Sequence, residues 1–386
     1  MRLAIDIRCL QDKYWTGVAD YTWNIINELN NHERPVDLLY YANCWRQKNN
    51  LPDNIKNGKN LIITHYPNKL QNFLLRYGLW KNLDQLMANH GQKPDIFWLP
   101  NLHFYKLSHQ IKKVLTIHDL SFIHFPQFFS KKKRWWYLAA MKKLLKNKLN
   151  DFDTVIAVSN HTKNDLVSLY PDIEKKIKVV WSGVGNEFFV PPSQAEIYNV
   201  AHEYDLPKNF LLSVSTIEPR KNHILLLKAY EQILSKNPDF IYDLIMVGSR
   251  GWLWQPVIKH WKNMKHSHRV HFVGFVPIEV LKVLYSKAKL FLYPSLYEGF
   301  GFPPLEAMAV GTPCLVSSSS SLPEIVEQAA ILLDPWVVDE WVETILMMVD
   351  NEALRQKYIY AGQQQAQKFS WKTAAAQTHN LFIKLL

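Results

Sequence analysis

Two glutamates flank a loop rich in glycine and proline near residue 300. Glu298 and Glu306 enclose the run Gly-Phe-Gly-Phe-Pro-Pro-Leu, which follows an apolar segment ending at Tyr293. The glycines let a backbone approach a ligand closely, and prolines suit the first turn of a helix, where a diphosphate binds well. Glu306 is suited to two vicinal ribose hydroxyls and Glu298 to the hydroxyls of a sugar. The alternative is a dipole-favouring residue in the first helical turn beside a loop charge, and the two glutamates alone do not decide between this and a nucleotide-sugar site.

A second candidate is the basic turn Ser215-Thr-Ile-Glu-Pro-Arg220-Lys221-Asn222. It follows a predicted strand and precedes a predicted helix. Arginine offers a planar fork and lysine a point charge, and the pair suits a pyrophosphate. Positive charge placed against a leaving nucleoside diphosphate would stabilise the transition state. The alternative is a solvated basic turn.

Two further motifs lie in the first half of the chain. His118-Asp119 stands at the carboxyl end of a predicted strand, where the histidine is either part of a site or structural. Thr16-Gly17-Val18 stands between a predicted strand and a helix. It is not G-x-G-x-x-G, which excludes a dinucleotide fingerprint. Its alternative is a simple strand-to-helix turn.

The segment from Ser130 to Lys148 is strongly basic and contains no acidic residue. Its first part holds the residues predicted to contact a membrane surface: Lys131, Lys132, Lys133, Arg134, Trp135 and Trp136. A basic amphipathic helix with interfacial aromatics is typical of a surface-binding element, and anionic lipid would attract it. The alternative is a packed helix with a solvated cationic face. A nucleic-acid groove is disfavoured because no nucleic-acid motif accompanies it.

Short apolar runs alternate with helical patterns through the whole chain, as expected of parallel sheets covered by helices. In the first half the predicted strands are Leu3–Ile7, Leu38–Tyr41, Leu61–Thr64, Ile96–Leu99, Val114–Ile117, Val155–Val158 and Lys178–Trp181. In the second half they are Phe210–Ser215, Tyr242–Val247, Val270–Val273, Leu290–Tyr293, Pro313–Ser317 and Ala330–Leu333. The predicted helices are Tyr21–Leu29, Lys131–Leu149, Thr162–Tyr170, His223–Leu234, Ile278–Ala288, Pro304–Ala309 and two more from Val338 and Glu352.

A chain of 386 residues is long enough for two domains. We expect an acceptor-binding domain at 1–190 and a nucleotide-sugar-binding domain at 191–368. The stretch from Phe188 to about Asn209, with three prolines, is interpreted as an irregular linker. Two doubly wound domains facing each other would leave a cleft at the carboxyl ends of their strands. A last helix at 369–386 is expected to cross back to the first domain.

Composition excludes several protein classes. The apolar fraction of 48% and charged fraction of 20% are those of a globular protein. Three scattered cysteines argue against a disulfide scaffold or a zinc site. The stretch Met1–Arg8, interrupted by Asp6 and Arg8, is not expected to be a signal peptide, and no apolar run of about 18 residues predicts a membrane-spanning helix. The net charge of +11 is compatible with general solubility, nucleic-acid binding or attraction to anionic lipid and phosphate groups, and charge alone does not decide between them. From the scattered cysteines and the lack of a predicted membrane helix, we expect a cytoplasmic protein that is peripheral on the cytoplasmic face of the inner membrane.

The segment from Glu298 to Pro313, followed by Pro323-Glu324, resembles the E-x7-E signature of the retaining glycosyltransferase family 4, which has the GT-B fold. The resemblance covers most of the chain and is strongest from about residue 210 to 335. It implies an α/β fold of two Rossmann-like domains. The family often carries a further arginine on the strand before the basic turn, where this chain has Ser215 and Thr216.

The resemblance also implies roles for individual residues. His118, Arg220, Lys221 and Glu298 would be catalytic. Donor contacts would come from Gly17, Arg220, Lys221, Glu298, Phe300, Gly301, Phe302 and Glu306. Asp119 and Gly17 would contact the acceptor, with Asp119 orienting His118. No metal or other cofactor is expected, because no Asp-x-Asp stands at a suitable strand end and the cations can replace a metal ion.

The motifs together are most similar to those of bacterial mannosyltransferases of surface-polysaccharide synthesis. The expected reaction is transfer of mannose from GDP-mannose, with retained configuration, to a glycan or a polyprenyl-diphosphate-linked glycan. A UDP-hexose donor and a non-catalytic protein that binds sugar nucleotides are the alternatives. Nucleic acid is not an expected partner.

Overall fold

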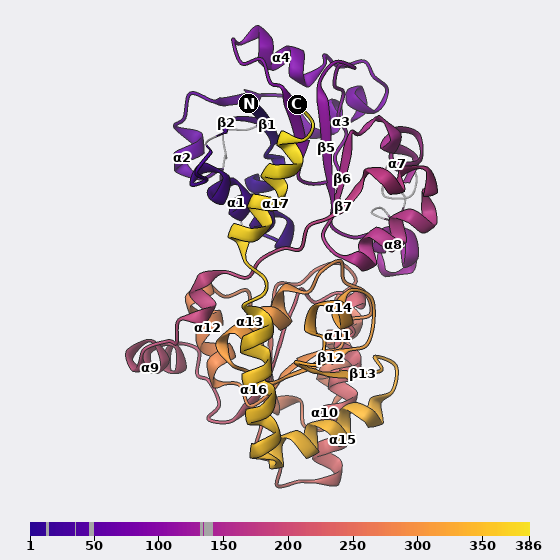
Figure 1. Cartoon of the computed structure of the whole chain (residues 1–386). Coiled ribbons are helices and arrows are strands. Elements are labelled where there is room, and N and C mark those ends of the chain that lie inside the picture. The colour runs from indigo at the N-terminus through magenta and orange to yellow at the C-terminus, as the bar shows by residue number, and fades with distance from the viewer. Residues whose placement is uncertain (13–14, 35, 46–49, 132–133, 135–141) are drawn as a thin grey trace. The chain divides into compact units, whose positions relative to one another are not determined.

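The computed structural model describes residues 1–386 except 13–14, 35, 46–49, 132–133 and 135–141 (Figure 1). The chain divides into two compact units. Unit 1 comprises Met1–Ile123, Lys133–Gly183 and Trp371–Leu386, and unit 2 comprises His124–Lys132 and Val184–Ser370. The main division falls before the predicted boundary at 190. A short stretch after Ile123 is counted with unit 2, which the sequence did not predict.

Unit 1 is built on a seven-stranded sheet with the order β3-β2-β1-β4-β5-β6-β7, in which neighbouring strands are parallel. The strands are β1 (Arg2–Asp6), β2 (Asp37–Asn43), β3 (Leu61–Thr64), β4 (Ile96–Leu99), β5 (Lys112–Ile117), β6 (Thr154–Ala157) and β7 (Ile177–Val179). The inner strands are almost wholly buried, as expected of a parallel sheet covered on both faces.

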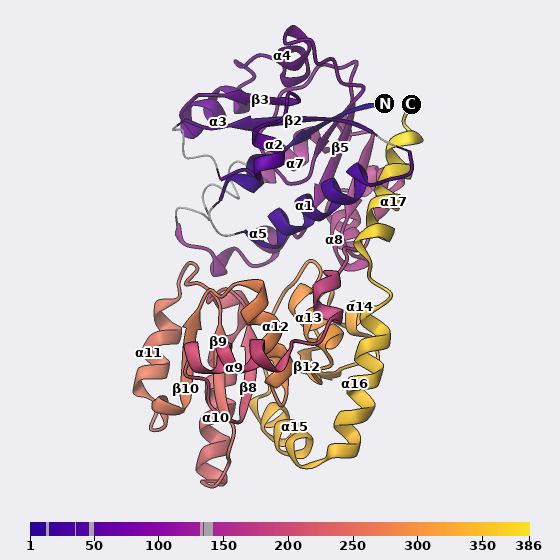
Figure 2. The ribbon, with the colours of Figure 1, turned by 90° about the vertical axis from the view of Figure 1, so that its left-hand side faces the viewer.

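The helices of unit 1 lie against this sheet, with α1 and α17 side by side (Figure 2). They are α1 (Gly17–Asn30), α2 (Asp53–Lys56), α3 (Asn68–Arg76), α4 (Leu83–Asn89), α5 (Ser121–His124), α7 (Lys143–Lys148), α8 (Asn160–Leu169) and α17 (Trp371–Ile383). The last of them, α17, packs along α1. The Trp371 ring lies 6.0 Å from Tyr21, and Phe382 lies 5.7 Å from Trp98. The end of the chain is therefore part of the core of unit 1.

Unit 2 is built on a six-stranded parallel sheet with the order β10-β9-β8-β11-β12-β13. The strands are β8 (Phe210–Val214), β9 (Asp243–Val247), β10 (Val270–Gly274), β11 (Phe291–Tyr293), β12 (Cys314–Ser317) and β13 (Ile331–Leu333). The helices are α9 (Gln194–Glu203), α10 (His223–Lys236), α11 (Gln255–Asn263), α12 (Ile278–Lys287), α13 (Phe302–Val310), α14 (Leu322–Val326), α15 (Val338–Asp350) and α16 (Glu352–Ala366).

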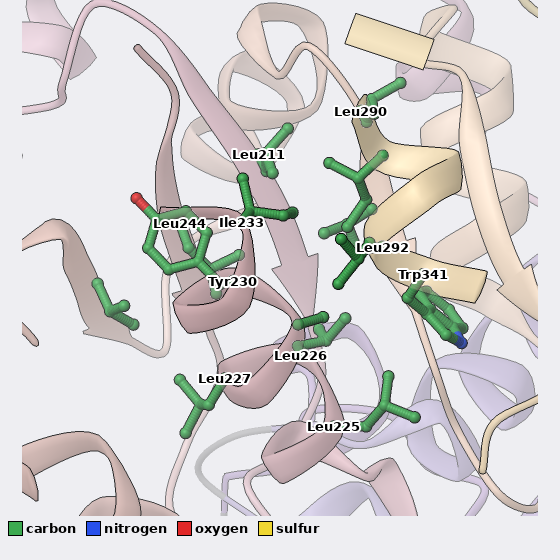
Figure 3. Close-up of a cluster of buried hydrophobic side chains, with 14 of the residues drawn as sticks. Leu211, Leu225, Leu226, Leu227, Tyr230, Ile233, Leu244, Leu290, Leu292 and Trp341 are labelled. Carbon is green, nitrogen blue, oxygen red and sulfur yellow. The ribbon is translucent and has the colours of Figure 1, made fainter. Parts of the chain in front are cut away.

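The largest apolar cluster of unit 2 lies between the sheet and helices α10 and α15 (Figure 3). Leu226 and Ile233 of α10 meet Leu292 of β11 and Trp341 of α15, all at most 2% exposed. Burying each such side chain contributes about 1.5–3 kcal/mol. This packing fixes α10 against the sheet, and with it the basic turn that precedes α10.

The prediction of an irregular linker from Phe188 to Asn209 was wrong, because α9 occupies much of it. Ser193 accepts a hydrogen bond from the Glu196 amide, and the Glu196 carboxylate accepts one from the Ser193 amide. This reciprocal capping box satisfies two amides at the start of the helix. The capping motif S-x-x-E is present in the sequence, but the prolines on either side led to the prediction of a linker.

Candidate donor site in unit 2 and family membership

The loop that carries Glu298 leaves β11 at the carboxyl end of the strand. It ends at Gly301, whose φ is +131°, before α13 begins at Phe302. A Cβ atom at Gly301 would lie 2.9 Å from Cδ2 of Leu322, so space and backbone both require glycine. Pro303 and Pro304 follow in the first turn and carry no amide hydrogen. Amide donors for an anion must therefore come mainly from the loop before α13.

The basic turn leaves the neighbouring strand, β8, at the same edge of the sheet. A short 3-10 helix covers Pro219–Lys221, and Asn222 with φ +54° leads into α10. The amide of Leu296 donates to the carbonyl of Arg220 over 2.8 Å. This bond joins the two loops directly.

Both carboxylate oxygens of Glu298 accept hydrogen bonds. Oε1 accepts from Lys221 Nζ at 2.5 Å, Tyr293 Oη at 2.9 Å and Ser295 Oγ at 2.5 Å. Oε2 accepts from Arg220 Nη1 at 2.8 Å. The structure thus brings Arg220, Lys221 and Glu298 into direct contact, and only 7% of Glu298 is exposed.

Arg220 lies between two carboxylates. Its Nε and Nη2 donate to Glu218 Oε1 over 3.0 and 2.9 Å, while Nη1 donates to Glu298 and to the Tyr297 carbonyl. Two cations and two carboxylates therefore form one cluster with no formal net charge. A diphosphate would bind here by taking over donors that now contact the glutamates.

The pKa shifts in this cluster follow from burial and charge. Burial would raise the pKa of Glu298, but the charges of Arg220 and Lys221 outweigh it and hold the pKa at about 2. Burial raises the pKa of Glu218, and Arg220 only partly offsets this. Burial and the charge of Arg220 lower the pKa of Lys221 despite Glu298. The shifts of Glu298 and Lys221 are not mirror images because Lys221 also faces a like charge.

Glu306 lies in the second turn of α13 and is partly exposed. Its Oε2 accepts a 2.8 Å hydrogen bond from the hydroxyl of Tyr285. Burial, followed by the charge of Glu306, raises the pKa of Tyr285, which keeps the hydroxyl protonated as a donor. The carboxylate is thus held in place by a residue that sequence reasoning did not identify.

A serine-rich turn supports the Glu298 loop. The Glu298 amide donates to Ser320 Oγ over 2.8 Å, and Ser321 Oγ donates to the carbonyls of Glu298 and Phe300. These serines, with Tyr293, Ser295 and Glu218, were not singled out from the sequence. The run Ser317–Ser321 was the one available signal.

The two phenylalanines of the loop differ in placement. Phe300 is 4% exposed, with its ring 5.2 Å from Phe302 and 5.8 Å from Phe369. Its side chain is part of the interior, so a donor would meet its backbone. Phe302 is partly exposed.

In unit 1, the His118 ring lies against Tyr21 at 4.9 Å, with Nε2 at 2.8 Å from the carbonyl of Pro100. Burial lowers the pKa of His118, which favours the neutral ring. Asp119 was expected to orient His118. Its Oδ1 instead accepts from the Ser121 amide and hydroxyl at 2.9 and 2.6 Å. Gly17 is exposed and is the first residue of α1.

The segment after Ile123 packs on loops of unit 2. Trp252 Nε1 donates to the Phe128 carbonyl over 2.7 Å, and the Trp252 and Phe129 rings are stacked at 5.3 Å. Phe125 lies 5.5 Å from the ring of Tyr297, the residue before Glu298. The segment therefore supports the Glu298 loop from outside.

Of the residues predicted to contact a membrane, Lys131 and Arg134 are described and exposed. Lys132, Lys133, Trp135 and Trp136 lie outside the described residues. The described part of the predicted helix Lys131–Leu149 is α7, followed by a 3-10 turn in which Leu149 is buried. No helix in the described part of the chain is both long and apolar enough to cross a membrane. Among the same residues, no three His, Cys, Asp or Glu side chains gather to hold a metal ion.

Comparisons with known proteins identify the family of this chain. The family model for glycosyl transferases group 1 matches residues 194–365, and that for glycosyltransferase family 4 matches residues 15–188. The chain is 34% identical over 308 residues to O-antigen chain mannosyltransferase B of Escherichia coli, covering 78% of this chain and 77% of that protein. It is 32% identical over 251 residues to the serotype-specific mannosyltransferase WbdA of Escherichia coli, covering 62% of this chain but only 30% of WbdA.

Among solved structures, sucrose-phosphate synthase from Thermosynechococcus elongatus superimposes with a TM-score of 0.75 at 20% identity, covering 100% of this chain and 98% of that one. This likeness shows the fold. Two Rossmann-like domains with parallel sheets of seven and six strands are the GT-B architecture. With the two family models and the mannosyltransferase relative, they show that the chain belongs to glycosyltransferase family 4 and is a GT-B glycosyltransferase.

Proposed function

We propose that this glycosyltransferase transfers mannose from GDP-mannose to a glycan, or a polyprenyl-diphosphate-linked glycan, in cell-surface polysaccharide synthesis. The observation that carries the donor part is the contact of Arg220 and Lys221 with Glu298 at the carboxyl edge of the unit 2 sheet. The names of the similar mannosyltransferases support mannose as the transferred sugar and polysaccharide synthesis as the pathway.

The cluster suits a donor whose diphosphate leaves as an anion. The two cations are held by Glu298 and Glu218. A diphosphate brings its own negative charge to the same donors, and bidentate contact with Arg220 would orient it. Positive groups fixed in advance stabilise the charge that develops on the leaving phosphate. Glu298 thus acts first as a positioning residue for the cations.

Glu298 would also accept a hydrogen bond from the donor sugar. Oε1 already accepts three hydrogen bonds, whereas Oε2 accepts one from Arg220 among the described residues. Oε2 therefore has more acceptor capacity left than Oε1 and would accept from a hydroxyl of the sugar. Glu306, oriented by Tyr285, would accept from the ribose hydroxyls.

Retention of configuration is proposed from family membership. None of the carboxylates in the unit 2 cluster suits a covalent nucleophile, because Glu218 and Glu298 are both bonded to cations. A front-face reaction, in which the leaving phosphate helps deprotonate the acceptor hydroxyl, needs no such group. Trapping a glycosyl-enzyme intermediate on a carboxylate would contradict this mechanism. We propose that neither a metal ion nor another cofactor is required.

A panel of nucleoside diphosphates tests the donor. Ligand at about 100 times its Kd stabilises the folded protein by about 2.7 kcal/mol, or roughly 5–10 °C in melting temperature for a unit of this size. GDP should raise the melting temperature more than UDP or ADP. If UDP gives the larger shift, the donor is a UDP-hexose, and if none does, a nucleotide-sugar site is contradicted.

We further propose peripheral attachment to the cytoplasmic face of the inner membrane through the basic residues 131–134. Charge reversal there should weaken binding to anionic liposomes while donor hydrolysis is unchanged, because these residues are not part of the donor cluster. Unchanged liposome binding would remove this part of the proposal.

A further inference from the structure

The buried face of helix α3 in unit 1 contains a polar residue. Gln71 is 1% exposed, and its Nε2 donates to Tyr41 Oη at 2.7 Å and to Thr64 Oγ1 at 3.0 Å. Leu75, one turn later, is also 1% exposed. These two residues anchor α3 beside β3, the edge strand of the sheet (Figure 2).

The outward face of α3 is apolar. Leu70, Phe73 and Tyr77 recur at helical spacing and are 46%, 54% and 59% exposed. The Phe73 and Tyr77 rings lie 4.8 Å apart. Leu79, which is 69% exposed, and Tyr66, at 45%, extend the patch at either end. A surface helix normally buries such a stripe, and large apolar side chains exposed on one helix and its flanks indicate an interaction site. We call these five residues the α3 patch.

The turn after α3 holds Leu79 outward in a defined geometry. Gly78 has φ +69° and the Leu79 amide donates to the Leu74 carbonyl over 2.8 Å, closing the helix. Lys106 Nζ donates to the carbonyls of Gly78 and Trp80, each over 2.8 Å. The exposure of Leu79 is therefore built into an ordered turn.

The surroundings of the α3 patch are basic. No Asp or Glu occurs in the sequence between Asp53 and Asp84. Lys69 lies on α3 and Lys81 follows its turn, both exposed, while the Arg76 guanidinium lies 5.6 Å from the Tyr77 ring centre. Leucines with aromatic side chains, rimmed by cations, are the composition of a helix that lies in a membrane interface.

We propose that the α3 patch docks unit 1 onto an anionic lipid bilayer, with the helix lying along the surface. A second copy of the chain fits the patch poorly. In a two-fold dimer the same basic rim would face itself, which like-charge repulsion disfavours. Anionic headgroups complement Lys69, Arg76 and Lys81. The inference extends the proposed membrane attachment to residues that the sequence did not suggest, and it does not depend on the donor.

Vesicle flotation with the full chain tests the inference, using phosphatidylcholine with and without phosphatidylglycerol. The variant K69E/R76E should bind the anionic vesicles at least about 25-fold less, because each cation near the surface contributes about fivefold. The variant L70S/F73S should also lose binding, because it removes the apolar contact. Y198S/Y360S is the matched control: these tyrosines are 71% and 69% exposed on helices of unit 2, and binding should be unchanged.

Three results would overturn the inference. The first is wild-type protein that does not bind anionic vesicles. The second is K69E/R76E and L70S/F73S that float as well as wild type. The third is a wild-type dimer that L70S/F73S converts to monomer in light scattering with no change in flotation, which would identify a contact between copies. The GDP-induced melting shift, measured on the same preparations, verifies folding and separates a failure here from a failure of the proposed donor.

Discussion

Glu298→Gln removes one negative charge from the buried cluster and leaves the side-chain shape nearly unchanged. In wild type, Glu298 accepts from Lys221 at 2.5 Å and from Arg220 at 2.8 Å. The side chains of these two cations are 11% and 14% exposed, so water cannot replace the lost partner. The glutamine also turns an amide donor toward groups that are themselves donors.

The expected loss of stability is about 3 kcal/mol. Removing one partner of a buried ion pair costs about 3–5 kcal/mol. Independently, the fall in the pKa of Glu298 from 4.5 to about 2 corresponds to about 3 kcal/mol. The lower end of this range applies because burial and the charge of Arg220 lower the pKa of Lys221, which reduces the net stabilisation from the Lys221–Glu298 pair. The melting temperature of unit 2 should fall by roughly 6–12 °C.

The stability difference should depend on pH in a defined direction. A carboxylate with a lowered pKa contributes fully above its unfolded pKa, here 4.5, and loses this contribution as pH falls toward about 2. Glutamine does not titrate. The difference between wild type and Glu298→Gln should therefore be constant near neutral pH and shrink below about pH 4.5.

Thermal unfolding followed by circular dichroism, at neutral pH and in steps to about pH 3, measures both effects. Glu327→Gln is the matched control in the same unit, because the Glu327–Lys368 pair at 3.1 Å is 53% and 57% exposed. An exposed pair contributes at most about 1 kcal/mol. The reasoning is refuted if Glu298→Gln melts like this control, or if its deficit stays constant as pH falls.

Three further substitutions probe the surroundings of the cluster. Gly301→Ala should cost about 1–3 kcal/mol in urea unfolding, because φ is +131° and the new Cβ would meet Leu322; wild-type stability would contradict this. Trp252→Phe replaces the indole with a smaller aromatic ring and removes the 2.7 Å hydrogen bond to the Phe128 carbonyl, so it should cost about 1 kcal/mol and speed tryptic cleavage at the basic segment that follows Phe128; an unchanged digest would count against the contact. Glu306→Gln should weaken GDP binding about 10–100-fold in calorimetry and affect 2′-deoxy-GDP less, whereas an equal loss for both would exclude ribose recognition.

Every strand of both sheets was predictable, because buried parallel strands are short apolar runs between helical patterns. β3 and β4 match their predicted bounds, Leu61–Thr64 and Ile96–Leu99, and the others differ by a few residues. Helix α9 was missed because the prolines around it favoured a linker despite its capping box. Helix α3 was missed because its apolar residues lie on the exposed face, whereas its buried face carries the polar residue Gln71. Periodicity identifies a helix face but not the side on which the protein lies.

Three charged members of the candidate site were predictable, but their contacts and the residues that hold them were not. Arg220, Lys221 and Glu298 were identified by residue type and spacing. Their mutual bonds arise because β8 and β11 are neighbours, although these residues lie 77 and 78 positions apart in the chain. The placement of Phe300 was not predictable either. The resemblance implied that it contacts the donor, but its side chain is buried and packs against Phe369.

We propose that this chain transfers mannose from GDP-mannose by means of the Arg220–Lys221–Glu298 cluster. The most direct test is release of GDP from GDP-mannose with a short mannose-containing acceptor, with the anomeric configuration of the product determined by NMR. We predict that wild type releases GDP and forms the α-mannoside, and that Lys221→Met lowers turnover at least about 100-fold, as expected for loss of a group that stabilises the leaving phosphate. A β-mannoside, no turnover of GDP-mannose, or a Lys221→Met variant as active as wild type would contradict the account.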